Sequence, residues 1–192
     1  MAAPSDPVDS LMFFTDGACT RNGYADARAS FAVSGASNVG GLVEPFEYEM
    51  IGEDIAGDDT GVNISVVPTA VAVQPSNNRG ELLAIIHALL AAMCAPGNAP
   101  CEIVSDSRIS IMTLEEWLPN RRRAGTAKKL RNLDLLTIAE TLLTAVRTRR
   151  SVVFTHINSH QKAPVAGAPE RDRIIWAGNA AADAAATELL RD

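Results

Sequence analysis

Four acidic residues lie where an α/β protein places its working side chains, at predicted strand ends and helix starts. They are Asp16, Glu81, Asp106 and Asp183. Asp16 is expected to end the first strand, Glu81 to lie in the first turn of a long helix, and Asp183 to lie one turn into the last helix. Carboxylates gathered in this way would repel one another and would require cations, and magnesium prefers such oxygen ligands. Each acid alone has an ordinary explanation, since carboxylates favour helix N-termini and most aspartates are exposed. Their shared placement is what makes them candidates for one site.

The elements that must position these acids alternate between strand and helix patterns, which predicts an α/β fold. An apolar run over 11–15 predicts a buried strand that turns at Asp16-Gly17, and Arg21-Asn22-Gly23 supplies a turn to a partner strand over 28–34. Further strands are predicted near 46–48, within 62–73 with Pro68 at an edge or a break, at 102–105 and at 151–156. Helices are predicted from Asn77 to a stop at Pro96-Gly97, from Ser107 through Leu118, from about Asn132 to Arg147, and from about Gly178 onward.

Composition indicates a globular protein of ordinary size. The chain has 192 residues, of which 47% are hydrophobic and 21% are charged, enough apolar content to bury a core. No apolar run reaches the roughly 18 residues of a membrane span, so no membrane association is expected. The first nine residues carry no basic side chain, which argues against a signal or transit peptide. Three cysteines without a Cys-x-x-Cys pair indicate a reducing compartment, so we expect a soluble intracellular monomer of the cytoplasm or nucleus.

The domain organisation is expected to be simple. Residues 1–10 are predicted to form a short N-terminal extension and residues 11–192 a single domain. Within that domain, an acidic, glycine-rich stretch near 35–61 is interpreted as an insertion, and 161–177 as a long loop rich in proline and glycine.

Positive charge is concentrated in one segment of an acidic chain. Between Arg121 and Arg150 there are nine basic and two acidic residues, 9 − 2 = +7, although the whole chain carries a net charge of −6. A solvated surface is the usual explanation for such a run, and contact with a polyanion such as nucleic acid is the alternative. The basic strip proposed to contact a nucleic-acid backbone consists of Arg121, Arg122, Arg123, Lys128 and Lys129.

Six short motifs, in order along the chain, resemble the signature motifs of one enzyme family, type 1 ribonuclease H. They are Thr15-Asp16-Gly17 through Gly23, Asn77-Asn78-Arg79-Gly80-Glu81, Ser105-Asp106-Ser107, Asn132-Leu133-Asp134-Leu135, His156 through His160, and Gly178-Asn179 through Asp183. Together they cover about residues 11–190. The resemblance implies the RNase H-like fold, a mixed central sheet of about five strands flanked by helices.

The resemblance also implies a chemistry. It implies an endoribonuclease that hydrolyses the RNA strand of RNA–DNA hybrids and leaves 5′-phosphate and 3′-hydroxyl ends. Two Mg²⁺ ions, with Mn²⁺ as a possible substitute, would activate water and neutralise charge on the attacking and leaving oxygens. By the same resemblance, the catalytic residues are the metal ligands Asp16, Glu81, Asp106 and Asp183 together with His160, which would assist proton movement or product release. His156 is expected to point into the structure.

Substrate recognition is carried over in the same way, residue by residue. The implied substrate-binding residues are Cys19, Asn22, Ser76, Asn77, Asn78, Trp117 and Asn132. Asn22, Asn77 and Asn78 would contact the 2′-hydroxyl that distinguishes RNA from DNA, although Asn also favours turns and helix caps. Trp117 would line the DNA-strand channel, and its alternative is an ordinary core aromatic residue. Ser76 and Asn132 would hold a DNA phosphate, but Gln74 replaces the family's usual arginine in that pocket.

Two other function classes stay open on the sequence alone. One is a non-catalytic module that binds RNA–DNA hybrids, and the presence of all four acids and His160 argues against it. The other is a different nuclease of the same superfamily, against which Asn22, Asn77 and Trp117 argue. No Gly-x-Gly-x-x-Gly follows a predicted strand, which disfavours a dinucleotide-binding domain.

Overall fold

The computed structural model describes residues 10–39, 42–44, 65–70 and 74–191. Its centre is a mixed sheet of six strands, in the order β3-β2-β1-β5-β6, with β4 also paired to β2. The strands are β1 (Leu11–Thr20), β2 (Arg28–Val39), β3 (Leu42–Glu44), β4 (Ser65–Ala70), β5 (Cys101–Ser105) and β6 (Val152–His156). This confirms the predicted α/β class, with one strand more than the expected five or so.

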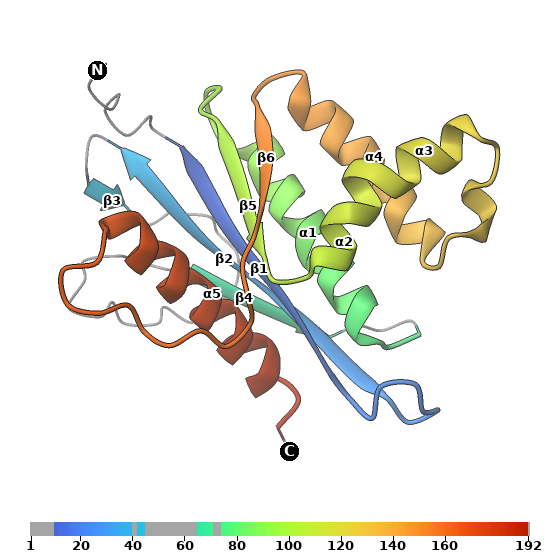
Figure 1. Cartoon of the computed structure of the whole chain (residues 1–192), viewed down its shortest axis with the longest axis horizontal. Coiled ribbons are helices and arrows are strands. Elements are labelled where there is room, and N and C mark those ends of the chain that lie inside the picture. The colour runs from blue at the N-terminus through green and yellow to red at the C-terminus, as the bar shows by residue number, and fades with distance from the viewer. Residues whose placement is uncertain (1–9, 40–41, 45–64, 71–73, 192) are drawn as a thin grey trace.

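Helices cover both faces of the sheet (Figure 1). They are α1 (Asn77–Cys94), α2 (Arg108–Met112), α3 (Leu118–Arg123), α4 (Leu133–Arg147) and α5 (Glu170–Glu188), with a π-helical turn at Thr113–Trp117 and a 3-10 turn at Ala127–Lys129. α5 lies on one face, and α1, α2 and α4 lie on the other. None of the helices within the described ranges is long and apolar enough to cross a membrane.

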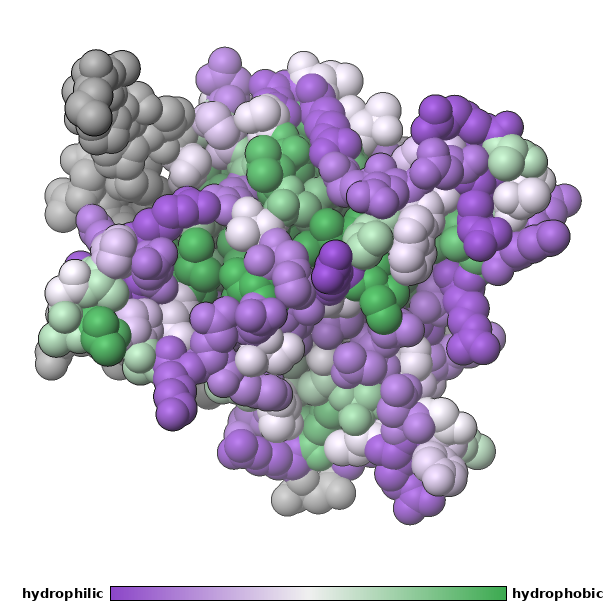
Figure 2. Space-filling model, viewed as in Figure 1, coloured by the Kyte–Doolittle hydropathy of each residue, from purple (hydrophilic) through white to green (hydrophobic). Residues whose placement is uncertain are grey.

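The central strand β1 is apolar throughout its first half because it is buried on both faces. Leu11 and Phe13 pack into the large core under α1 and α4, whereas Met12 and Phe14 pack under α5. Such a strand shows a continuous apolar run rather than alternation. Figure 2 shows the resulting surface, where hydrophilic residues cover most of the face viewed and apolar residues emerge in patches along its middle.

The first strand extends further than predicted. β1 continues through Asp16 and Gly17 to Thr20, because its antiparallel pairing with β2 runs from Leu11↔Ser37 to Thr20↔Arg28. Its parallel pairing with β5 stops at Thr15↔Ser105. Asp16 is therefore mid-strand in β1, yet it is the first residue beyond the parallel part of the sheet. The predicted turn at Asp16-Gly17 is wrong, whereas the turn following Arg21 is confirmed.

The predicted insertion at 35–61 begins too early. Gly35–Val39 belongs to β2, and Leu42–Glu44 forms β3 against it. The strand predicted near 46–48 and the rest of that stretch lie outside the described residues. β4 occupies Ser65–Ala70 and pairs with β2 opposite Pro68↔Ala32, which agrees with the edge position that Pro68 predicted.

The last helix also begins earlier than predicted, at Glu170 rather than near Gly178. The loop expected at 161–177 is shorter as a result, and Asp183 lies more than three turns into α5. The sequence did not predict this start because no polar side chain caps the helix. Pro169 precedes the first turn, and Glu170 and Asp172 supply negative charge to it. α5 packs so closely on the sheet that a side chain at Gly178 would overlap the Phe14 ring.

Candidate active site

Asp16 and Asp106 lie together because the strands that carry them are parallel neighbours. Asp16 follows the last parallel pair of β1, and Asp106 directly follows β5. Asp16 is only 6% exposed, and its Oδ1 accepts a hydrogen bond from the backbone N–H of Gly17 at 2.8 Å. After Asp106, Ser107 caps α2 by accepting from the N–H of Ser110. This is the sheet edge at which α/β proteins bind their ligands.

Glu81 reaches Asp16 because two glycines allow α1 to touch β1. A Cβ placed on Gly17 would lie 2.6 Å from the carbonyl carbon of Gly80, and one placed on Gly80 would lie 2.6 Å from the backbone oxygen of Ser30. Neither approach leaves room for a side chain. The first turn of α1 is thereby pressed onto the strand, and Glu81, the next residue, is 4% exposed beside Asp16.

The three carboxyl groups form one cluster. Ligand oxygens of Asp16, Glu81 and Asp106 all lie within 4.8 Å of one another. Burial and the negative charges of Asp106 and Asp183 raise the pKa of Asp16 to about 8. Burial and the charges of Asp16 and Asp106 raise the pKa of Glu81 well above its usual range. The site therefore concentrates negative charge that cations would relieve.

Asp183 and His160 complete one side of the cluster. Asp183, on α5, is close enough to Asp16 for its charge to help raise the pKa of Asp16, although it lies outside the three-carboxylate group. His160 Nδ1 is 3.4 Å from Asp183 Oδ2, and the imidazole is 79% exposed on the loop that follows β6. The structure thus brings all five predicted catalytic residues into one region. His156 is exposed rather than pointing into the structure, so that prediction was wrong.

The cluster has the donor set of a divalent-cation site. Glu81 Oε2 is buried and has no hydrogen-bond partner among the described residues. A buried carboxylate oxygen without a partner is costly unless a cation or a proton satisfies it. All of the candidate ligands are carboxylate oxygens, the type that hard cations such as Mg²⁺ bind. The residues present therefore fit a metal centre.

Four of the predicted substrate-binding residues lie between the end of β1 and the start of α1. Asn22 Oδ1 accepts from the backbone N–H of Asn77 at 3.4 Å, and that N–H also lies against the Cys19 sulfur. Asn77 Nδ2 donates to Glu81 Oε1 at 3.5 Å. Ser76 is the N-cap of α1 and accepts from the N–H of Arg79. The Asn77 amide therefore lies directly beside the Glu81 carboxylate, and the Asn22 amide lies against the backbone of Asn77.

The other predicted contact residues line a separate groove of about 260 Å³. Asn78, Trp117 and Asn132 all line it, together with Arg121 and Lys129. Trp117 belongs to the π-helical turn and is 41% exposed, so it is not an ordinary core aromatic residue. This groove combines a flat apolar side chain, amide groups and three basic side chains, since Arg131 also lines it.

Arg79 positions this groove, a role that sequence reasoning missed. Its guanidinium makes a two-pronged ion pair with Asp134 at 3.1 and 2.7 Å, and it donates to Asn132 Oδ1 at 3.5 Å. The Arg79 side chain is buried, and the pair lowers the pKa of Asp134. Asn132 adopts φ = +56°, just before α4. Arg79 and Asp134 both belong to motifs quoted above, but only the fold shows that they are in contact.

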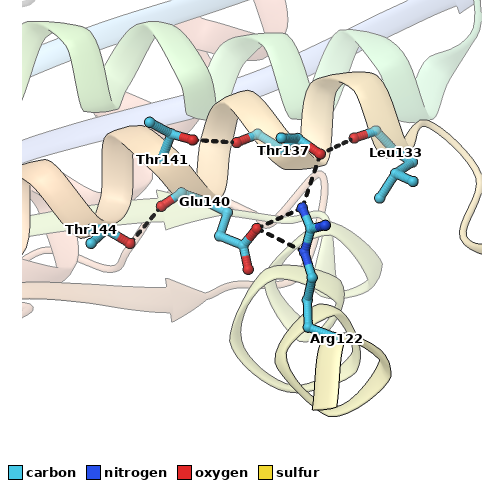
Figure 3. Close-up of polar contacts among 6 residues, drawn as sticks. All are labelled: Arg122, Leu133, Thr137, Glu140, Thr141 and Thr144. Atoms are coloured by element: carbon cyan, nitrogen blue, oxygen red, sulfur yellow. Dashed lines mark hydrogen bonds and ion pairs between the residues drawn. The ribbon is translucent and has the colours of Figure 1, made fainter. Parts of the chain in front are cut away.

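The basic segment is less available than its local charge of +7 suggests. Arg122 is held against α4, donating to Glu140 Oε2 at 3.1 and 2.9 Å and to Thr137 Oγ1 at 3.1 Å (Figure 3). Arg123 folds back onto Asn120 Oδ1 at 2.6 Å. The basic strip therefore divides into Arg121 and Lys129 at the groove, exposed Lys128, and two arginines that already have protein partners.

Further along the same segment, three more arginines have structural roles. Arg147 pairs with Glu115 at 2.9 Å. Arg149 and Arg150 donate to backbone carbonyls at and beyond the C-terminal end of α1, which has no basic residue in its own last turn. Cations at that end stabilise a helix. Much of the basic charge thus stabilises the fold.

Known proteins share this family and this fold. The family model for RNase H matches residues 8–191. A search of curated protein sequences finds no match. Solved structures with the same fold include the RNase H domain of PFV, at 18% identity and a TM-score of 0.60, with 96% of each chain covered.

Two further structures show the same similarity. LC9-RNase H1, a type 1 RNase H, is 18% identical with a TM-score of 0.58, covering 96% of this chain and 75% of that one. The foamy viral protease-reverse transcriptase in complex with RNA/DNA hybrid is 16% identical with a TM-score of 0.59, covering 98% of this chain and 21% of that one. The fold is therefore the RNase H fold that the resemblance implied. Because the family model spans nearly all of the sequence, this chain belongs to the RNase H family and is a ribonuclease H hydrolase.

Proposed function

We propose that this chain is an endoribonuclease that cuts the RNA strand of RNA–DNA hybrids by two-metal-ion catalysis, leaving 5′-phosphate and 3′-hydroxyl ends. The observation that carries the proposal is the cluster of Asp16, Glu81 and Asp106, with oxygens within 4.8 Å of one another and one buried Glu81 oxygen without a partner. Membership of the RNase H family gives the same activity in general terms.

In this proposal the metal ligands are Asp16, Glu81, Asp106 and Asp183. When bound there, two Mg²⁺ ions, or Mn²⁺ in their place, would supply charge neutralisation and an activated water. The charges of both Asp106 and Asp183 act on Asp16 and raise its pKa. His160 is the exposed group beside Asp183, and it moves a proton or assists departure of the product.

The two strands of the hybrid would meet different parts of the surface. Asn77, beside Glu81, and Asn22, against the Asn77 backbone, contact the 2′-hydroxyls of the RNA strand. Cys19 packs against the same backbone, and Ser76 caps the helix. Trp117 and Asn132 hold the DNA strand in the groove, whose lining also includes Asn78. Arg121 and Lys129 add phosphate contacts there, and Lys128 lies nearby in sequence. We expect a monomer to suffice, because every proposed group comes from one chain.

The test uses a hybrid with labelled RNA, and matched RNA and DNA duplexes as controls. Each is incubated with protein in Mg²⁺, in Mn²⁺ and in EDTA, and the product ends are identified by their susceptibility to a 5′-phosphate-dependent exonuclease. Cutting of the hybrid's RNA alone, abolished by EDTA, is expected. Asp106→Asn should remove it, while Asp26→Asn, an exposed carboxylate on the β1–β2 turn, should not.

Two other outcomes would overturn the proposal. Tight hybrid binding without cutting in either metal would make the chain a binding module. Cutting of DNA duplexes or branched DNA in preference to the hybrid would make it another nuclease of the superfamily.

A further inference from the structure

The loop that carries His160 is long and lies on the surface. It occupies residues 157–169, between the end of β6 and the start of α5, and it passes beside α5 before it enters that helix (Figure 1). Surface loops are mobile unless contacts hold them. A group that moves a proton must lie within hydrogen-bond reach of the reacting atoms, and a displacement of about 1 Å can cost about 100-fold in rate. His160 can therefore act beside Asp183 only if this loop is held in place.

α5 contacts the loop at two points on one face of the helix. The Trp176 indole Nε1 donates to the Gln161 carbonyl at 3.0 Å. The next contact joins His160 Nδ1 to Asp183 Oδ2 at 3.4 Å. Trp176 and Asp183 are seven positions apart on α5, a spacing that places them on one side of the helix, about 10 Å apart along its axis. Two consecutive loop residues are thus attached to α5 two helical turns apart.

Of these two contacts, the Trp176 hydrogen bond is the stronger attachment. Within the part of the chain that the structure describes, no other side-chain hydrogen bond or ion pair joins residues 157–168 to α5. A cavity of about 620 Å³ lies between the loop and the helix, lined by both contact pairs. The His160 imidazole is 79% exposed, so water screens its interaction with Asp183. The Trp176 N–H is therefore the main polar support of this part of the loop.

The backbone at His160 also requires support. Its φ of +50° lies in the left-handed region, which a residue with a side chain adopts at a cost in free energy. Such conformations persist where surrounding contacts enforce them, and they gather at active sites. Gln161 Nε2 donates to the Asn158 carbonyl at 3.2 Å and closes the turn around His160. Gln161 thus shapes the turn with its side chain and attaches it to α5 through its carbonyl.

We propose that Trp176 is a positioning residue: its indole N–H holds the Gln161 carbonyl and thereby keeps the His160 imidazole beside Asp183 during cleavage. The indole has a single N–H donor, and this donor is used on the loop backbone. Trp176 therefore acts through His160 rather than on the carboxylates. The inference rests on the proposed function, since it requires that His160 takes part in the reaction.

The first test separates the hydrogen bond from the packing of the ring. Trp176→Phe removes the N–H and keeps an aromatic side chain. It should lower kcat for hybrid cleavage about tenfold and leave KM within about a factor of two, because the groups proposed to bind the hybrid lie elsewhere. Val165→Ala is the matched control on the same loop, where the side chain is 78% exposed, and it should match the wild type in both constants. A wild-type kcat for Trp176→Phe overturns the inference.

A double-mutant cycle tests whether Trp176 acts through His160. His160→Ala should lower kcat by about 100-fold, the usual scale for loss of a proton-transfer group. Adding Trp176→Phe to His160→Ala should cause no further loss, because the group that Trp176 positions is already gone. Losses that multiply would show that Trp176 acts on the fold in general, and a wild-type kcat for His160→Ala would leave it nothing to position. Either result overturns the inference.

A second readout depends on neither metal nor cleavage. The chain has two tryptophans, so the ¹H–¹⁵N spectrum of the protein in EDTA contains two indole N–H signals, and Trp117→Phe leaves only that of Trp176. In the wild type the Trp176 signal should exchange with D₂O more slowly than that of Trp117, which is 41% exposed. Equal exchange overturns the inference. A protein that shows this protection but cuts no hybrid in Mg²⁺ or Mn²⁺ would overturn the proposed function and leave the loop attachment in place.

Discussion

Replacing Asp16 by asparagine should stabilise the metal-free protein while removing its activity. Asp16 is nearly fully buried, and its pKa is raised from 3.8 to about 8 by burial and by the charges of Asp106 and Asp183. At neutral pH the folded protein must therefore hold a proton that the unfolded chain releases. Asparagine has nearly the same shape, keeps an oxygen for the Gly17 N–H, and needs no proton.

The size of the effect follows from the two pKa values. The stability that Asp16 contributes is fully present below pH 3.8 and is lost as the pH rises toward 8, because the folded state binds the extra proton. Each pH unit in that window costs about 1.4 kcal/mol, so at pH 7 the penalty is at most about 4 kcal/mol, and at pH 5 at most about 1.6 kcal/mol. Asp16→Asn should remove this pH-dependent loss.

The assay is denaturant unfolding in EDTA from pH 5 to pH 8, on the wild type, Asp16→Asn and the exposed control Asp26→Asn. The stability gained by Asp16→Asn should grow with pH, while Asp26→Asn should follow the wild type within about 0.5 kcal/mol. Saturating Mg²⁺ or Mn²⁺ should stabilise the wild type, by about 2.7 kcal/mol at a hundred times Kd, and should not stabilise Asp16→Asn. Equal stability of Asp16→Asn and wild type at every pH would refute the argument that burial and repulsion strain this carboxylate.

Three more predictions concern the residues that position the site. Gly80→Ala should push α1 away from β1, because the new Cβ would lie 2.6 Å from the Ser30 oxygen; a loss of about 1–3 kcal/mol in unfolding and up to about 100-fold in kcat is expected, and full activity would contradict it. Arg79→Lys should cost about 2 kcal/mol by breaking the two-pronged pair with Asp134, seen as a lower Tm, and an unchanged Tm would contradict it. Arg121→Ala should lower the salt dependence of hybrid binding by about one phosphate contact, whereas Arg122→Ala should change it much less, because Arg122 is already paired; equal slopes for the two variants would show that both contact phosphate.

The order of elements was accessible from the sequence because each pattern is local. The helix over Asn77–Cys94 begins with capping residues and ends before Pro96-Gly97, and both signals act within one turn. The strand at Cys101–Ser105 is an apolar run followed by a polar cap. In these places the local preference and the tertiary structure agree.

Helix and strand boundaries that depend on residues distant in the sequence could not be predicted from the sequence. β1 continues past Asp16 because β2 pairs with it as far as Arg28, and this pairing overrides the turn preference of Asp16-Gly17. α5 begins at Glu170. The charged residues of its first turns obscure the helical pattern in the sequence, although Ile174 and Ala177 are buried against the sheet. Both errors come from tertiary contacts that outweigh local propensity.

The sequence predicted the acids of the site, but it did not predict the contacts that hold them in position. The contacts of Gly17 with Gly80 and of Arg79 with Asp134 join segments more than 50 residues apart. Gly80 and Arg79 stand inside a recognised motif, which signals importance without saying what either residue touches.

The way α5 is fastened to the sheet has a consequence for the time course of folding. Ser34 Oγ donates to the Gly178 carbonyl at 2.8 Å and Ser30 Oγ donates to the Ala186 carbonyl, across 144 and 156 residues of chain. Contacts of such long range close large loops, and these form slowly. Asp183 lies between those two anchors, so the fourth acid reaches its place only when this docking is complete. Recovery of cleavage after dilution from denaturant should therefore lag behind the recovery of helical signal. The rate at which cleavage returns would then measure the rate at which α5 docks.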